Sequence, residues 1–250
     1  MNFTPNDLLL ISGLVFIVAA LYSSVGHGGA SGYLAILALY SVSSPLMSST
    51  ALILNVIVSG IGLTMFWRAG HAQLRTLWLF AIGSVPAALI GGLLVVPHQV
   101  YSALLIIALT VAAFRLAFQF GESSIESVTP KKPSRLVTVS VGASIGLLSG
   151  IVGVGGGIFL GPILLLAKWA NAKQTAGICA GFIFVNSLAA LAGRGLNGTL
   201  QIGTLAPFLA AALLGGIIGS YLGAQRFSPM LIRKVLAVVL MIAVIKLAIT

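Results

Sequence analysis

Two glycine-rich stretches interrupt an otherwise apolar sequence, and their composition suits the binding of an anion. The first covers residues 24–30 (SVGHGGA) and the second covers residues 151–157 (IVGVGGG). A helix that restarts after such a break, near Ser31 and near Ile158, presents N–H groups without intrahelical acceptors and the positive end of its dipole. Glycine places no Cβ between the backbone and a ligand. The breaks therefore predict backbone anion sites; turns that only allow tight packing are the alternative.

Polar side chains near the breaks could complete such a site. His27 is the only ionisable side chain inside either break, and its counterpart is the apolar Val154. It could donate to an anion or carry a proton, or it could simply cap the restarted helix. Asn55 and Asn186 stand at similar places in the two halves and would be costly against lipid, so each should face the cavity or another helix. The predicted substrate-binding residues are Ser24, Gly26, His27, Gly28, Gly29, Ser31, Asn55, Gly153, Gly155, Gly156, Gly157 and Asn186.

Other candidate groups have simpler explanations beside the functional ones. Arg194, flanked by two glycines, could attract anions or gate the pathway, or it could anchor its segment at the membrane interface. Cys179, the only cysteine, could take part in sulfur transfer, but a small buried residue is the more common role. Glycines spaced by four residues predict close helix packing, and they are Gly142, Gly146, Gly150, Gly215, Gly219 and Gly223.

Carboxylates and metal ligands are scarce. The chain has three acidic residues, Asp7, Glu122 and Glu126, and none lies within an expected membrane segment. The usual carboxylate relay for protons or site for sodium is therefore not expected. No His, Cys or carboxylate cluster predicts a metal, and we expect no cofactor and no catalytic residue.

The composition shows what must position these residues. Of the 250 residues, 59% are hydrophobic and 6% are charged, which differs greatly from a soluble domain. We therefore expect an all-α integral membrane protein without a separate catalytic domain, and not an enzyme. The apolar runs predict segments at 8–24, 32–43, 46–66, 76–95, 100–118, 136–150, 157–167, 174–192, 202–224 and 230–249.

The basic charge predicts topology rather than nucleic-acid binding. The chain has 13 Lys and Arg against 3 acidic residues, a formal charge of +10. If regions 8–43 and 136–167 each return to their starting side, one side of the membrane holds only Arg194 and Lys246. The other side holds Arg68, Arg75, Arg115, Lys131, Lys132, Arg135, Lys168, Lys173, Arg226, Arg233 and Lys234. The positive-inside rule then predicts a multi-pass plasma or inner membrane protein with both termini outside the cytoplasm. Whether each returning region holds two full spans or a shorter re-entrant hairpin stays open, and length favours the hairpin.

The two halves follow the same order of segments. Each has an apolar segment, a glycine break, a short apolar segment and three longer helices, with Gly26, Gly28 and Gly29 matching Gly153, Gly155 and Gly156. Such an order predicts two inverted repeats, each a broken helical hairpin plus three transmembrane helices, with about 8–10 membrane segments in all. We expect a first transmembrane repeat at 1–122, a cytoplasmic linker at 123–133 and a second transmembrane repeat at 134–250.

With these paired GxGG-type breaks, the chain resembles the sulfite exporter TauE/SafE family of membrane permeases from about residue 8 to residue 248. The resemblance implies a secondary transporter, expected to be an exporter, of small anions such as sulfite or organosulfur oxyanions. Alternating access around the paired glycine loops is the expected mechanism. The expected partners are the small anion and the lipid bilayer, with a homo-oligomer possible and no nucleic acid. An anion channel and a membrane-embedded sulfur-transfer enzyme are the alternatives.

Overall fold

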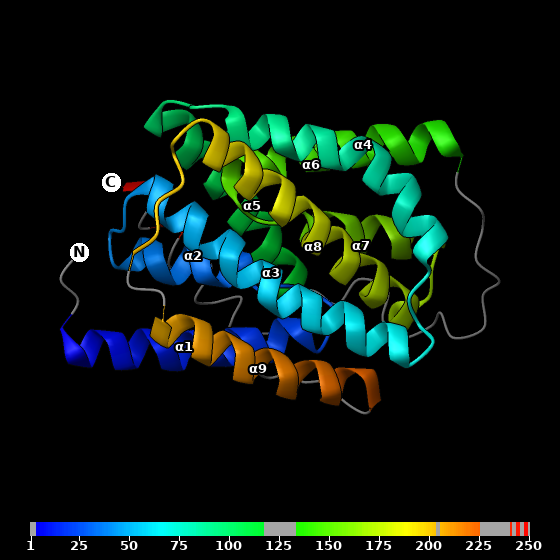
Figure 1. Ribbon diagram of the computed structural model, residues 1–250, viewed down its shortest axis with the longest axis horizontal. Coiled ribbons are helices and arrows are strands. Elements are labelled where there is room, and N and C mark those ends of the chain that lie inside the picture. Colours follow the sequence, from blue (N-terminus) through cyan, green and yellow to red (C-terminus); the bar gives the residue numbers. More distant parts are fainter. Residues whose placement is uncertain are drawn as a thin grey trace.

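The computed structural model describes residues 4–117, 134–203 and 206–225, together with residues 241, 244, 245, 248 and 249. In this part of the chain the only regular elements are helices (Figure 1). They are α1 (Pro5–Ser23), α2 (Ala30–Leu39), α3 (Ser44–Arg68), α4 (Leu74–Leu93), α5 (His98–Ala117), α6 (Arg135–Val152), α7 (Gly157–Leu166), α8 (Ala172–Leu196) and α9 (Ala206–Gln225). The all-α membrane fold is confirmed. The expected linker at 123–133 and most of the segment expected at 230–249 lie outside the described residues.

Local sequence signals set several helix ends. Thr4 and Asp7 form a capping box at the start of α1, and Asn171 and Gln174 form another at the start of α8. At the glycine breaks, each short helix begins after a left-handed glycine, as at Gly156, the N-cap of α7 with φ 82°, and α6 ends at the left-handed Gly153. Each expected segment in the described residues therefore corresponds to one helix.

Helix length clarifies the two returning regions. Six described helices are long and apolar enough to cross a bilayer, and they include α1 with 19 residues and α6 with 18. Each is followed, after its break, by a helix of 10 residues, α2 or α7. A helix rises about 1.5 Å per residue, so α2 and α7 reach about half-way across the hydrocarbon core. Each region therefore pairs a full-length helix with a half-length one. This arrangement lies between the two expected alternatives, two full spans and a short re-entrant hairpin.

The helices of the two halves interleave. In the first half, α4 packs on α6 and α8 of the second; in the second half, α9 packs on α1 and α3 of the first (Figure 1). The longest helices, α3 and α8, pack against each other between these groups. If α4 corresponds to α9, as the predicted repeat requires, then both pack on corresponding helices of the other half, while the repeat itself stays a prediction.

Glycines make the closest of these contacts. A Cβ on Gly146 of α6 would lie 2.7 Å from the Cα of Ser84 on α4, and one on Gly219 of α9 would lie 2.6 Å from the carbonyl carbon of Ala20 on α1. Gly142, Gly150, Gly215 and Gly223 meet the facing backbone in the same way. The packing role predicted for all six glycines is confirmed.

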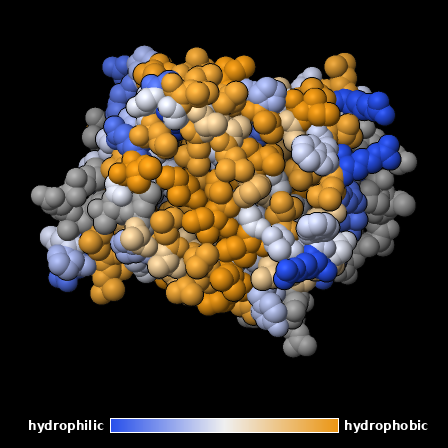
Figure 2. Space-filling view, viewed as in Figure 1, coloured by the Kyte–Doolittle hydropathy of each residue, from blue (hydrophilic) through white to orange (hydrophobic). Residues whose placement is uncertain are grey.

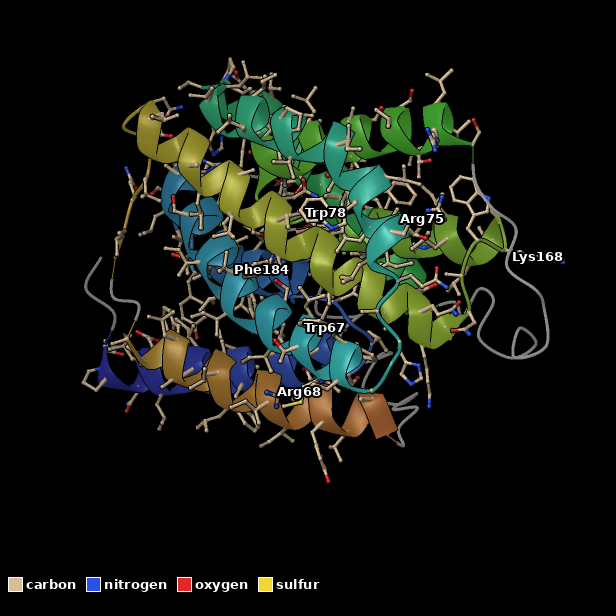
Figure 3. The ribbon with its side chains drawn as sticks, turned by 45° about the vertical axis from the view of Figure 1, so that its right-hand side comes forward. Trp67, Arg68, Arg75, Trp78, Lys168 and Phe184 are labelled. Carbon is tan, nitrogen blue, oxygen red and sulfur yellow. The ribbon has the colours of Figure 1, made fainter. Side chains whose placement is uncertain are left out.

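The surface has an apolar middle and polar ends. Figure 2 shows apolar side chains across the middle of the face, with hydrophilic side chains gathered towards both ends. Figure 3 shows Arg68 and Arg75 on either side of the turn between α3 and α4, close to the exposed indoles of Trp67 and Trp78. Gly177, near the start of α8, lies against that turn, so Lys173 belongs to the same end. The clustering agrees with the loop-charge argument, while the membrane side of this end stays a prediction.

Candidate functional site

The two short helices begin at Ala30 and Gly157, one residue before the restarts expected near Ser31 and Ile158. Gly29, with φ 95°, is the N-cap of α2, and Gly156 is the N-cap of α7. In both breaks the first glycine is also left-handed, with φ 74° at Gly26 and 88° at Gly153. Because an L side chain rarely adopts these angles, glycine is needed at these positions whatever the surrounding space.

The two breaks meet the same two side chains. A Cβ on Gly28 would overlap Asn55 Oδ1 and lie 3.0 Å from Ile183 Cγ2; a Cβ on Gly155 would lie 2.5 Å from Asn55 Nδ2 and 2.8 Å from Ile183 Cγ2. Asn55 comes from α3 and Ile183 from α8, and both are buried. The middle glycines of the breaks, 127 positions apart in sequence, therefore converge on one place between the longest helices.

This convergence corrects the sequence alignment of the asparagines. Helices α3 and α8 both have 25 residues, and aligning their first residues places Asn55 opposite Ile183 rather than Asn186. The first glycine of each break supports this alignment. Gly26 packs on Ala176 of α8 and Gly153 packs on Ser48 of α3, and the alignment places Ser48 opposite Ala176. Asn186 is displaced by nearly one helical turn from the position that matches Asn55.

Asn55 forms hydrogen bonds with both breaks. Its Oδ1 accepts from the N–H of Ala30 at 3.1 Å, and its Nδ2 donates to the carbonyl of Val154 at 3.3 Å. Ala30 is the first residue of α2, so the amide oxygen occupies the acceptor position at that helix N-terminus. The side chain is fully buried, and the two bonds satisfy its oxygen and one of its amide hydrogens.

Asn186 and Ser187 contribute the polar groups on the α8 side. Asn186 Nδ2 donates to the carbonyl of Phe182 in its own helix, and its Oδ1 is buried without a partner among the described residues. Ser187 Oγ is also buried without a described partner, and it lies 3.2 Å from the position of a Cβ on Gly155. Sequence reasoning missed Ser187 and Ile183; aligning the two long helices from their N-termini would have indicated Ile183.

The remaining polar candidates of the first break mainly brace their own loop. Ser24 Oγ donates to the carbonyl of Leu21, and Ser31 Oγ donates to the hydroxyl of Tyr22. His27 Nδ1 lies 2.9 Å from the carbonyl oxygen of Val25, to which it donates. All three side chains are buried. They therefore hold the loop in shape, and their proposed contacts with an anion stay predictions.

The last two glycines of the second break lie against α6 and α8. A Cβ on Gly156 would lie 2.7 Å from Ile145 Cγ2, and one on Gly157 would lie 2.7 Å from Ile183 Cγ1. Cys179 Sγ, fully buried, donates to the carbonyl of Gly157 at 3.6 Å. The only cysteine of the chain thus lies at the N-terminus of α7, beside the candidate site.

Arg194 lies inside the protein rather than on its surface. Its side chain is 7% exposed, and Nη2 donates to the carbonyls of Gly150 at 3.2 Å and Ile151 at 2.8 Å. These carbonyls end α6, where the helix dipole favours a cation. The equivalent position in α3 is Phe66, so this arrangement has no counterpart in the first half. The contacts hold the α6 end of the second break, and a gating role stays a prediction.

The arrangement has the donors that a small oxyanion needs. The N-terminus of α2, the loop that leads into α7, an amide and a hydroxyl surround the convergence of the breaks. Among the described residues the hydroxyl has no partner and no acidic side chain lies there. Within the described ranges no group of three His, Cys, Asp or Glu residues could hold a metal ion. The site would therefore recognise negative charge through backbone dipoles and neutral donors.

Comparison with known proteins agrees with this reading. The family model described as sulfite exporter TauE/SafE matches residues 11–247. A Sinorhizobium fredii protein named "Probable membrane transporter protein y4hK" is 37% identical over 233 residues, covering 93% of this chain and 94% of the relative. A Bacillus subtilis protein named "Probable membrane transporter protein YjnA" is 23% identical over 254 residues, covering 96% and 98%. No solved structure matches the chain.

Proposed function

Because this chain belongs to the sulfite exporter TauE/SafE family and is a multi-pass membrane transporter of that type, we propose that it exports small oxyanions as a secondary transporter. Sulfite and organosulfur oxyanions such as sulfonates are the proposed substrates. The family name supports sulfite, and the site supports the broader class, since any small oxyanion presents several acceptor oxygens and no obligatory donor.

One observation carries this proposal: the N-terminus of α2 and the loop that leads into α7 converge on Asn55 between α3 and α8. The first N–H of α2 points at this place, and the positive end of that helix dipole favours a negative ligand without a buried cation there. Irregular backbone at membrane depth is tolerated inside protein or beside water, which is where transporters place broken helices. The convergence is therefore the best-supported place for the substrate.

The proposed mechanism is alternating access by two inverted repeats. The equivalent neighbours of the two halves support a repeat, and three spans plus one returning region per half would make the second copy inverted. The buried side chains at the convergence fit a conformation closed around the site. Rocking of one repeat against the other would open each side in turn.

Export needs no coupling ion in this scheme. A cell interior at about −100 mV favours outward movement of an anion by about 2.3 kcal/mol per charge. The scarcity of acidic residues, three in the whole chain, fits transport that lacks a carboxylate relay. His27 would be the proton carrier if export is coupled, and its burial inside the first break makes it the group to test.

The test is a substrate screen in proteoliposomes. Sulfite, thiosulfate, sulfoacetate, taurine and two carboxylates are offered with and without a membrane potential. We expect saturable exchange of one or more sulfur oxyanions, faster when the potential drives the anion outward. If no labelled anion exchanges in any condition while the protein is folded and inserted, the proposal is wrong.

Two alternatives give different results in the same system. An anion channel would give currents far above the turnover of a carrier and no counterflow. A sulfur-transfer enzyme would depend on Cys179, so loss of all activity in Cys179→Ala would favour it. We expect counterflow in the wild type and continued transport in Cys179→Ala.

A further inference from the structure

Asn55 is unusual in forming hydrogen bonds with both glycine breaks. Its oxygen accepts from Ala30 in the first half, and its nitrogen donates to Val154, which is 99 positions away in sequence. The side chain is fully buried and adjoins both Gly28 and Gly155. One carboxamide thus joins the first residue of α2 to the loop before α7.

The amide oxygen stands where an anion oxygen would be expected to bind. The first N–H of a helix has no intrahelical acceptor and is a standard donor to anions. Here the N–H of Ala30 already donates to Asn55 Oδ1 at 3.1 Å. A bound oxyanion and Asn55 Oδ1 would compete for the same donor, so the carboxamide must turn away before the anion can use it.

A second donor lies ready beside the other break. Ser187 is fully buried, its hydroxyl has no partner among the described residues, and it lies close to Gly155. A buried hydroxyl without a partner is costly, and an incoming acceptor would remove that cost. The site therefore holds one donor already occupied by Asn55 and one donor not yet used.

We propose that Asn55 is a latch displaced by the substrate: its carboxamide joins the two breaks in the empty site, and an oxyanion releases it by taking over the N–H of Ala30 and the hydroxyl of Ser187. This inference rests on the proposed transport function. It narrows the ligand to small oxyanions with several acceptor oxygens, because the ligand takes the place of an acceptor and bonds to two donors, the N–H of Ala30 and the hydroxyl of Ser187.

The first test compares the KM of wild type and Asn55→Ala. Exchange of labelled methanesulfonate is measured in proteoliposomes with equal pH on both sides and no potential, because this anion keeps one charge throughout the useful pH range. Removing the competing oxygen should lower KM about fivefold, the value of one ordinary hydrogen bond, and should lower the maximal rate because the breaks are no longer joined. A purely structural asparagine would leave KM unchanged or raise it.

Asn55→Asp provides a second measurement that does not depend on the first variant folding. A charged carboxylate repels the anion and cannot donate to Val154, so KM should rise at least tenfold at about pH 8. Acid protonates the carboxyl, which then has the shape and the donor of the native amide. The ratio of the variant's KM to that of wild type should therefore return towards one as the pH is lowered to about 4 and below.

Thr138→Ala is the control, because Thr138 is equally buried and its hydroxyl donates only within its own helix, near the start of α6 and away from the breaks. It should not lower KM. The latch is wrong if Asn55→Ala has a KM equal to or above that of wild type, or if the Asn55→Asp ratio is the same at every pH. A wild-type protein that moves no anion would instead overturn the proposed function, and the latch with it.

Discussion

Replacing Gly28 with alanine should displace Asn55 without straining the backbone. Gly28, unlike Gly26 and Gly29, does not have a left-handed φ, so alanine is tolerated locally. Its Cβ, however, would overlap Asn55 Oδ1 and lie 2.8 Å from Cγ, where ordinary contact begins at 3.4 Å. The carboxamide must shift by several tenths of an ångström or more, which breaks its hydrogen bonds to Ala30 and Val154.

The cost follows from these contacts. The two hydrogen bonds contribute about 1 kcal/mol each, overpacking a filled interior costs about 1–3 kcal/mol, and replacing glycine returns about 0.4–1 kcal/mol through the unfolded chain. We therefore expect Gly28→Ala to lower the free energy of unfolding by about 2–4 kcal/mol. In an Asn55→Ala background only the flexible end of Ile183 remains in the way, at 3.0 Å. There the same change should cost about 1 kcal/mol.

The assay is a double-mutant cycle on unfolding in mixed detergent micelles titrated with SDS. The expected coupling energy between positions 28 and 55 is about 2 kcal/mol. Gly62→Ala serves as the control, since its Cβ would make only ordinary contacts of 3.5 Å with Ala180 Cβ and 3.6 Å with Ser220 Oγ. If the losses of unfolding free energy in Gly28→Ala and Asn55→Ala add up, within about 0.5 kcal/mol, to the loss in the double variant, then Asn55 does not fill the space that Gly28 leaves.

Three further outcomes are expected. Gly146→Ala, whose Cβ would press on the Ser84 backbone, should lower the free energy of unfolding by about 1–3 kcal/mol, and equal stability of this variant and Gly62→Ala would refute the glycine packing. Arg194→Met should lower the free energy of unfolding by about 1–3 kcal/mol, because it leaves the α6 carbonyls without their donor. Arg194→Lys should have a stability between those of wild type and Arg194→Met. If Arg194→Met is as stable as wild type in the same SDS titration, that role is wrong. Cys179, buried beside Gly157, should react with a membrane-impermeant methanethiosulfonate only when the site opens. Bound methanesulfonate should therefore slow the labelling of Cys179. If no transported anion changes the labelling rate, the pathway lies elsewhere.

The helices and their breaks could be predicted from local sequence. Each described apolar run ends at glycine, proline or polar residues, and the structure begins or ends a helix within a few residues of each expected boundary. The left-handed glycines could be predicted because only glycine adopts such angles freely, and the packing glycines because their spacing of four places them on one face. These features depend on neighbours in the chain, so the sequence alone defines them.

Which residues meet across the molecule was decided by the tertiary structure. Spacing indicated that Asn55 and Asn186 face protein, but the packing of two 25-residue helices set the register that pairs Asn55 with Ile183 and brings it to Val154. The sequence also placed Arg194 at a segment end, while packing turned it inward onto the carbonyls of α6. Helical periodicity shows which face of a helix is buried but not what that face meets, and a polar side chain acquires its role from the partner that folding brings to it.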